Sequence, residues 1–206
     1  MPEPDSQSDP IDFYFDFSSP YGYFAAARID FVVAPFDRVV RWHPILLGPA
    51  MERSGNQPLI TQPSKGAYSV HDWERVARFM DLPWTLPDPF PIATVRTARA
   101  FYWIEDTQPD LAKPFAMAAY RAYFGGGAAI NDADVVADIA AGVGLGRQAV
   151  LDAIETPEIK QRLRDEVDAA MEKGVFGSPY VVVDGEPFWG SDRLWMIKKW
   201  LQSGGW

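Results

Sequence analysis

The sequence contains no cysteine among its 206 residues, and only two histidines, His43 and His71. Without a thiol, the protein itself forms no disulfide, builds no thiolate metal site and carries out no thiol–disulfide exchange. Two histidines also argue against a histidine-rich metal centre. We therefore predict no metal site and no redox chemistry based on the protein's own side chains.

Positive charge is also scarce, because 19 lysines and arginines face 28 acidic residues and give a net charge of -9. Nucleic-acid binding calls for a basic surface, so it is excluded. No apolar run is long enough to span a membrane, and residues 1–10 lack the basic and apolar regions of a signal peptide. We expect a disordered tail at residues 1–10 and a soluble, cytoplasmic protein.

Hydrophobic residues, in contrast, make up 48% of the chain, which is typical of a globular protein. Ile11–Phe17 alternates apolar and polar residues with the period of a half-buried strand. A helix is predicted from Pro20 to about Val33, with Ser19 as its N-cap. Free backbone N–H groups at a helix start favour an anion. Ser19 is therefore a candidate site residue, although an ordinary capped helix would explain the same pattern.

The middle of the chain is predicted to be mostly helical. A second strand at Arg38–Trp42, parallel to the first, precedes it. Residues 48–65 are rich in glycine and proline and predict a long loop, either a tether or a binding loop ending in Lys65. Helix starts are then expected at Ser69–Asp72 (a capping box), Thr94, Pro114, Asn131, Arg147 and Thr156, with an extended connector at Leu82–Pro91.

Sheet signals return near the C-terminus. Tyr180–Val183 is an apolar strand of the kind covered on both faces, Asp184-Gly185 is a hairpin turn, and Phe188-Trp189 begins the partner strand. A helix follows at Arg193–Leu201. The order β-α-β, helices, β-β-α is that of an α/β thioredoxin-like domain interrupted by an all-helical insertion. We predict that residues 11–47 and 175–206 form the thioredoxin-like domain and residues 48–174 the inserted helical domain with its binding loop.

Two positions in this order suggest thiol chemistry. Pro179 opens a strand, where the missing N–H is tolerated. In thioredoxin-like folds this proline is cis and the residue before it binds a thiol, whereas a trans proline is the simpler alternative. Ser19-Pro20-Tyr21-Gly22 stands where thiol oxidoreductases of this fold carry two cysteines. Since that scaffold is kept without a thiol, we infer that a cofactor supplies the thiol.

Five segments with consistent order and spacing carry a resemblance to a known family. They are D-F-Y-F-D-F-S-S-P-Y at 12–21, H-P-I-L-L-G at 43–48, S-G-N-Q-P at 54–58, F-G-S-P at 176–179 and F-W-G-S-D-R at 188–193. The chain resembles the 2-hydroxychromene-2-carboxylate isomerases, which are related to kappa-class glutathione transferases and to disulfide-forming periplasmic oxidoreductases. The resemblance extends from about Ile11 to Leu201.

The resemblance implies a glutathione cofactor, a homodimer and a set of site residues. Ser19 would be catalytic, donating a hydrogen bond to the glutathione thiolate. The cysteinyl part would pair with the backbone beside Pro179, and an acid would hold the γ-glutamyl ammonium. The implied cofactor-binding residues are Asn56, Lys65, Ser178, Pro179, Ser191 and Asp192. Gly22 and Tyr180 depart from the family, which commonly has serine at the first position and threonine or serine at the second.

The implied function is glutathione-dependent isomerisation of an aromatic conjugated 2-oxo acid, 2-hydroxychromene-2-carboxylate in the family. The implied mechanism is thiolate addition, bond rotation and elimination. The alternatives are a kappa-like glutathione transferase or peroxidase and a non-catalytic binding protein. Lys65 could equally be a solvated lysine, and Asp192 a first-turn acid of the last helix. Trp42 and Trp189, near strand ends, could stack on an aromatic substrate.

Overall fold

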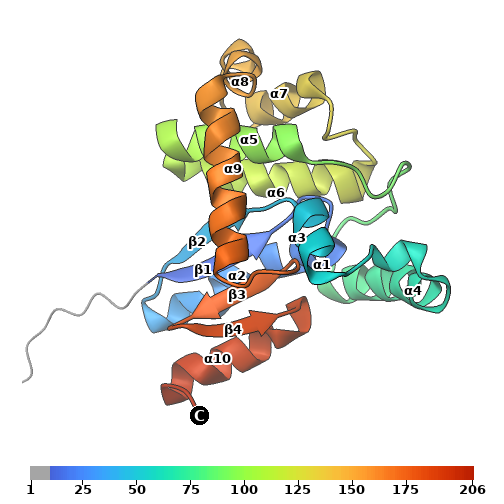
Figure 1. Ribbon diagram of the computed structural model, residues 1–206, viewed down its shortest axis with the longest axis vertical. Helices are drawn as coiled ribbons and strands as arrows, with labels where there is room; N and C mark the ends of the chain where they lie inside the picture. Colours follow the sequence, from blue (N-terminus) through green and yellow to red (C-terminus); the bar gives the residue numbers. More distant parts are fainter. Residues whose placement is uncertain (1–9) are drawn as a thin grey trace, which may run out of the picture.

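The computed structural model describes residues 10–206 and contains a four-stranded sheet in the order β2-β1-β3-β4 (Figure 1). β1 (Ile11–Phe15) pairs in parallel with β2 (Val40–Pro44) and antiparallel with β3 (Tyr180–Val183). β4 (Glu186–Trp189) pairs antiparallel with β3 at the other edge. This arrangement confirms the predicted α/β thioredoxin-like class. The tail predicted at residues 1–10 lies outside the described residues except for Pro10.

Helices cover both faces of this sheet. One face packs on α1 (Pro20–Ala26), α2 (Ile29–Val33) and α10 (Leu194–Ser203), and the other on α9 (Pro157–Glu172). Tyr14, on the α9 side of β1, is therefore only 2% exposed and clusters with Ala170 of α9. The expectation of a half-buried first strand is wrong, because α9 covers the face that the alternating pattern assigned to water.

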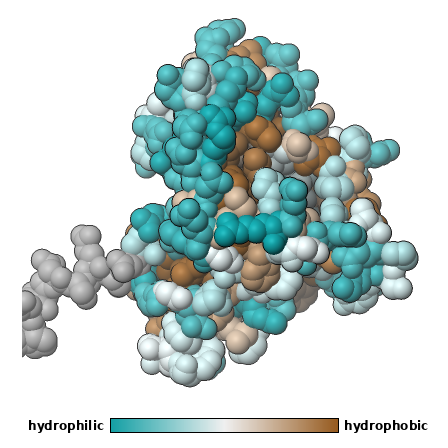
Figure 2. Space-filling model, viewed as in Figure 1, coloured by the Kyte–Doolittle hydropathy of each residue, from teal (hydrophilic) through white to brown (hydrophobic). Residues whose placement is uncertain are grey.

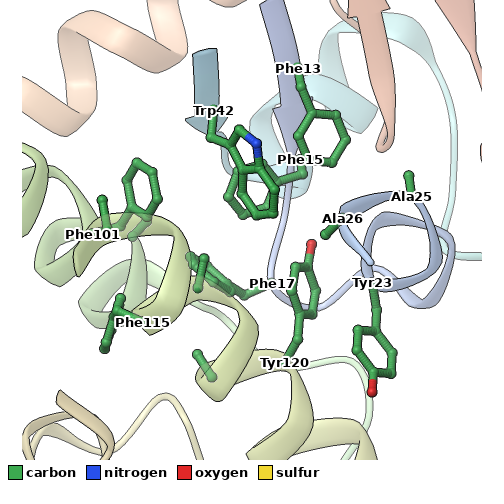
Figure 3. Close-up of a cluster of buried hydrophobic side chains, with 14 of the residues drawn as sticks. Phe13, Phe15, Phe17, Tyr23, Ala25, Ala26, Trp42, Phe101, Phe115 and Tyr120 are labelled. Carbon is green, nitrogen blue, oxygen red and sulfur yellow. The ribbon is translucent and has the colours of Figure 1, made fainter. Parts of the chain in front are cut away.

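The helical segment between β2 and β3 packs on the same core as the sheet. Phe15 lies 5.5 Å from Trp42 of β2 and 6.0 Å from Phe101, measured between ring centroids (Figure 3). Phe17 lies 5.3 Å from Tyr120. The first strand thus anchors the segment predicted as an insertion, while the domain boundaries themselves stay a prediction.

The elements of that segment follow one another closely. They are α3 (Leu47–Ser54), α4 (Pro63–Met80), α5 (Val95–Thr107), α6 (Pro109–Tyr120), the π-helix Arg121–Gly125, α7 (Ala133–Gly142), α8 (Arg147–Ala153) and α9. Short 3-10 turns lie at Ala34–Phe36, Leu59–Thr61 and Ser191–Arg193. Leu82–Pro91 is an extended connector, as predicted.

The long irregular loop predicted at residues 48–65 is wrong. α3 occupies Leu47–Ser54, and α4 already begins at Pro63. Pro49 lies in the first turn of α3, where no intrahelical N–H is needed, and Gly55 ends that helix with a φ of 71°. The glycines and prolines that suggested a loop are therefore the start and stop signals of a short helix.

Two other helix starts were also misplaced. The capping box at Ser69–Asp72 lies inside α4, because Pro63 takes the first helical position six residues earlier. Pro114 lies inside α6, which begins at Pro109. Its ring leaves the carbonyl of Asp110 without an intrahelical donor, a small cost because that residue is exposed to water.

The remaining differences are small shifts. The helix predicted from Pro20 to Val33 is broken at Arg28, whose φ of -131° is not helical, so α1 has seven residues. β2 lies two residues later than predicted, since it pairs with β1 as far as Pro44. Asp132, rather than Asn131, caps α7. Thr156 caps α9 as predicted, and Asp184-Gly185 forms the predicted turn with φ values of 53° and 85°.

The surface is mainly hydrophilic on the face that Figure 2 shows, with hydrophobic residues gathered between the upper helices and the rest of the molecule. Among the helices of residues 10–206, none combines the length and the hydropathy that crossing a membrane requires.

Candidate active site

Ser19 lies at the end of the turn that leads from β1 into α1. Its hydroxyl oxygen accepts a hydrogen bond from the N–H of Gly22 at 3.0 Å, which is the predicted N-cap. The hydroxyl donates to the carbonyl oxygen of Ser178 at 3.0 Å. Ser19 is only 5% exposed, so its proton is directed at the loop before β3.

That loop contains the predicted cis proline. The Ser178-Pro179 peptide bond is cis, so the simpler trans alternative is wrong. Among residues 10–206, the N–H of Ser178 has no hydrogen-bond acceptor. The carbonyl oxygen of Pro179 accepts from the N–H of Gly190 at 3.1 Å, which ties this loop to the segment that carries Ser191 and Asp192.

Asp16 is a site residue that the sequence analysis missed. Its carboxylate is 3% exposed and accepts four hydrogen bonds, from the N–H and hydroxyl of Ser18 at 2.7 and 2.8 Å, from the hydroxyl of Thr94 at 3.0 Å and from the N–H of Leu47 at 2.7 Å. Burial raises the pKa of Asp16 while these bonds lower it, and the net pKa is above its usual value. The Asp-x-Ser spacing is the signal that could have identified the turn.

The backbone of Asp16 connects the same elements. Its N–H donates to the hydroxyl oxygen of Ser178 at 2.9 Å. Its carbonyl oxygen accepts from the N–H of Ser19 at 2.9 Å and from the hydroxyl of Tyr120 at 3.0 Å. β1, the cis-proline loop and α6 therefore meet at one residue.

Gly22 is explained by the same group of contacts. A Cβ atom at this position would lie 2.7 Å from the Tyr120 hydroxyl oxygen, 2.8 Å from the Ser178 hydroxyl oxygen and 3.1 Å from Cβ of Ser19. Two hydroxyl groups thus fill the space that a side chain at position 22 would need. A side chain at position 22 would therefore require these hydroxyl groups to move.

Lys65 lies in the first turn of α4, two turns before the residues of that helix that contact α1. Lys65, Tyr68 and Asp72 are spaced by three and four residues and share one face of the helix. The hydroxyl of Tyr21, in α1, donates to the Asp72 carboxylate at 2.8 Å and joins that face to α1. Lys65 is exposed and has no ion-pair partner among the described residues.

Asn56 is not brought into contact with Ser19. It follows α3 directly, and its side-chain amide donates to the hydroxyl oxygen of Ser54 at 3.0 Å. The first residue of the helix before it, Leu47, donates its N–H to the Asp16 carboxylate at 2.7 Å.

Asp192 lies in the 3-10 turn Ser191–Arg193, which precedes α10. This turn packs against α1. Its side chain is 72% exposed, and one carboxylate oxygen accepts from the guanidinium of Arg193 at 2.7 Å. Gly190 makes this turn possible, because its φ is 112° and a Cβ atom there would lie 2.5 Å from the Asp192 carboxylate. Ser191 is half-buried in the same turn.

The two tryptophans proposed for substrate stacking differ. Trp42 is 2% exposed and packs among Phe13 and Phe15, so it is a core residue and that prediction is wrong. Trp189 is 54% exposed and lies 4.9 Å from the Phe176 ring, with its indole over Gly177.

Because α1 has seven residues and ends at Ala26, its dipole is smaller than that of the longer predicted helix. An anion at this site would depend mainly on hydrogen bonds from Ser19 and from the cis-proline loop. The surface hollow lined by Val70, Glu74, Arg78, Leu82, Trp84, Thr85 and Leu86 contains none of these residues.

The fold and this site define a thioredoxin-like protein with a serine in place of the usual thiol, and comparison with known proteins agrees. Residues 10–202 match the family described as the DSBA-like thioredoxin domain. The chain is 30% identical to 2-hydroxychromene-2-carboxylate isomerase of Sphingobium xenophagum over 193 residues, which cover 93% of this chain and 97% of the relative.

Two further comparisons refine the placement. A solved structure of a 2-hydroxychromene-2-carboxylate isomerase superposes with a TM-score of 0.85 at 26% identity, covering 94% of this chain and 95% of the other. Glutathione S-transferase kappa 1 of Caenorhabditis elegans is 28% identical over 205 residues, covering 93% and 90% of the two chains. The chain belongs to the DSBA-like family and, within it, to the 2-hydroxychromene-2-carboxylate isomerase family, and it is an enzyme of the isomerase class.

Proposed function

We propose that this isomerase requires glutathione and converts 2-hydroxychromene-2-carboxylate, or a closely related aromatic conjugated 2-oxo acid, to its trans-o-hydroxybenzylidenepyruvate form. The observation that carries the proposal is the contact between the Ser19 hydroxyl and the Ser178 carbonyl oxygen, 3.0 Å apart, beside a cis proline. This arrangement can hold a sulfur, and the chain has no cysteine to supply one.

The residues at the site fit glutathione. The N–H of Ser178 lacks an acceptor among the described residues, and a cysteinyl carbonyl group could fill that role. Lys65 is an exposed cation without an ion pair, suited to a carboxylate of the tripeptide. Asp192 can hold the ammonium group of the γ-glutamyl residue, and Ser191 can donate a hydrogen bond to the carboxylate of that residue. Pro179 would shape the loop, and Asn56 would reach the cofactor from the end of α3.

When bound, glutathione supplies a thiolate that adds to the conjugated double bond and leaves again after rotation about the resulting single bond. Ser19 has one hydroxyl proton, and it now points to the Ser178 carbonyl oxygen. Rotation of the hydroxyl would turn this proton toward the sulfur, so that the hydroxyl donates a hydrogen bond to the thiolate and lowers the pKa of the thiol. The N–H of Gly22 keeps the Ser19 oxygen in place during that change.

A kappa-like glutathione transferase or peroxidase remains the second candidate, because kappa-class relatives reach 28% identity over most of the chain. It would use the same thiolate site with a different electrophile. The two functions differ in their products, and not in the residues that activate the sulfur.

The test combines binding with turnover. Glutathione should raise the melting temperature of the protein, and the purified enzyme should isomerise the chromene carboxylate only when glutathione is present. Conjugation of an electrophilic chloroaromatic compound without isomerisation would favour the transferase. Equal isomerisation with and without glutathione would reject the cofactor.

Three further parts of the proposal concern the protein as a whole. We place the protein in the cytoplasm and expect it to be a homodimer. Its binding partner would be its substrate, a small aromatic acid, and it would bind neither nucleic acid nor membranes. Size-exclusion chromatography with light scattering would test the dimer.

A further inference from the structure

The geometry points to Asp16 as a positioning residue that fixes the two halves of the glutathione site relative to each other. This inference rests on the proposed function. The backbone of Asp16 bonds to Ser19 and Ser178, whereas its carboxylate contacts none of the residues proposed to bind glutathione. The role of the carboxylate follows from the segments that it joins.

The carboxylate of Asp16 receives donors from three segments that are distant in the sequence. Ser18 belongs to the turn before α1, Leu47 opens α3, and Thr94 precedes α5, at separations of 2, 31 and 78 residues. The first segment positions Ser19. The second leads through α3 to Asn56, the residue proposed to reach the other end of the cofactor.

The hydrogen-bond donors around Asp16 require an acceptor at both of its side-chain oxygens. A backbone N–H faces each carboxylate oxygen, Ser18 at Oδ1 and Leu47 at Oδ2, and such a group can only donate. A carboxylate accepts at both oxygens, whereas the amide of an asparagine presents hydrogens on one side. Replacement by asparagine would therefore keep the size of the side chain and detach one of the two backbone segments.

The charge of Asp16 and its positioning role predict opposite effects on bound glutathione. A buried negative charge near the sulfur opposes the thiolate, so its removal alone would lower the thiol pKa. Displacement of the Ser19 hydroxyl would instead weaken its hydrogen bond to the thiolate and raise the pKa of the thiol. The direction of the change therefore distinguishes a positioning residue from a bystander charge.

The experiment compares Asp16→Asn with wild type and with Asp12→Asn as a matched control. Asp12 lies in β1, four residues before Asp16, and its carboxylate pairs with Arg41 and His43 of β2. We expect Asp16→Asn to raise the thiol pKa of bound glutathione, followed by thiolate absorbance, by about one unit, and to lower kcat/KM by about tenfold. Asp12→Asn should leave both within about twofold, because Asp12 bonds to Arg41 and His43 and not to the turn that carries Ser19.

A second measurement does not depend on glutathione. Amide hydrogen exchange in Asp16→Asn should accelerate in both the Ser18–Gly22 and the Leu47–Ala50 segments, and in neither segment of Asp12→Asn. If Asp16→Asn does not fold, Thr94→Val, which removes a single donor, should shift the exchange in the same direction.

The outcomes separate the two proposals. Absence of a glutathione thiolate in wild type would reject the proposed function, while the exchange result would still decide the role of Asp16. A lowered thiol pKa, or unchanged exchange in both segments of Asp16→Asn, would overturn the inference.

Discussion

The hydroxyl of Ser19 donates a hydrogen bond to the carbonyl oxygen of Ser178, 159 positions away in the chain, at 3.0 Å. The same two residues are joined a second time through Asp16, whose N–H donates to the Ser178 hydroxyl and whose carbonyl accepts from the Ser19 N–H. Two separate connections thus hold the serine against the cis-proline loop. This site and its surroundings lead to five predictions.

Replacing Ser19 by alanine should remove the donor to the thiolate. A hydrogen bond to a charged group contributes about 1.5 to 3 kcal/mol, so kcat/KM should fall about ten- to a hundredfold and the bound thiol pKa should rise. Ser203→Ala is the matched control, because that hydroxyl is exposed near the C-terminus and bonds to the Lys199 carbonyl oxygen. Activity of Ser19→Ala equal to that of the control would show that this serine does not act on the sulfur.

Gly22→Ala should destabilise the protein by about 1 to 3 kcal/mol, because the new Cβ atom overlaps the hydroxyl groups of Tyr120 and Ser178. The loss should be smaller in a Tyr120→Phe background, which removes the nearer oxygen. Denaturant unfolding of the four proteins in this double-mutant cycle measures the coupling. Gly142→Ala, at an open helical position of α7, is the control and should change the stability by less than about 0.5 kcal/mol. Additive effects of the two substitutions would contradict the proposed overlap.

His43 should make stability depend on pH. Burial lowers the pKa of His43, but its hydrogen bonds and attraction to Asp12 and Glu166, at 3.1 and 3.5 Å, prevail. The pKa of His43 therefore lies above the usual histidine value of 6.5. The stabilisation is then fully present below about pH 6.5, the unfolded value, and is lost as the pH rises through the native pKa.

The measurement is the free energy of unfolding of wild type and His43→Gln between pH 5 and pH 9. The difference between the two proteins should be largest on the acid side and shrink with rising pH. His71→Gln, at an exposed position of α4, is the control. A difference that grows towards pH 9 would mean that burial, rather than the two carboxylates, decides the protonation of His43.

The Asp12 carboxylate should make the stability of the protein fall at acid pH. Burial raises the pKa of Asp12, while the hydrogen bond and attraction of His43, with Arg41 and Lys173, bring it down to about 2. The contribution of Asp12 is therefore present above about pH 3.8 and is lost as the pH falls towards 2. In Asp12→Asn, the free energy of unfolding should therefore depend less on pH between about pH 2 and pH 4 than in wild type.

Lys65→Ala and Asp192→Asn should raise KM for glutathione with little change in kcat, since both groups would hold the ends of the cofactor and not the reacting atoms. The groups are exposed, so each effect should reach at most about fivefold. Lys198→Ala, an exposed lysine of α10 outside the site, serves as the control. Equal KM values for all three variants would show that glutathione does not bind to Lys65 and Asp192.

Local sequence signals predicted the strands of the sheet and the Ser19 cap of α1 correctly. Alternation in Ile11–Phe15, the cap at Thr156 and the Asp184-Gly185 turn are decided by neighbours within a few residues, so the sequence reveals them. Resemblance placed Ser19 and Ser178, and the structure brings these two residues into contact.

Tertiary contacts decided the rest. The helix starts at Pro63 and Pro109 were missed because proline signals both a loop and a first helical turn, and only packing distinguishes the two. Burial of Tyr14 required α9, more than 140 residues downstream. Asp16 is the clearest case. The sequence shows a polar residue in an alternating strand, whereas its role depends on donors from Leu47 and Thr94, which lie near it only after the chain has folded.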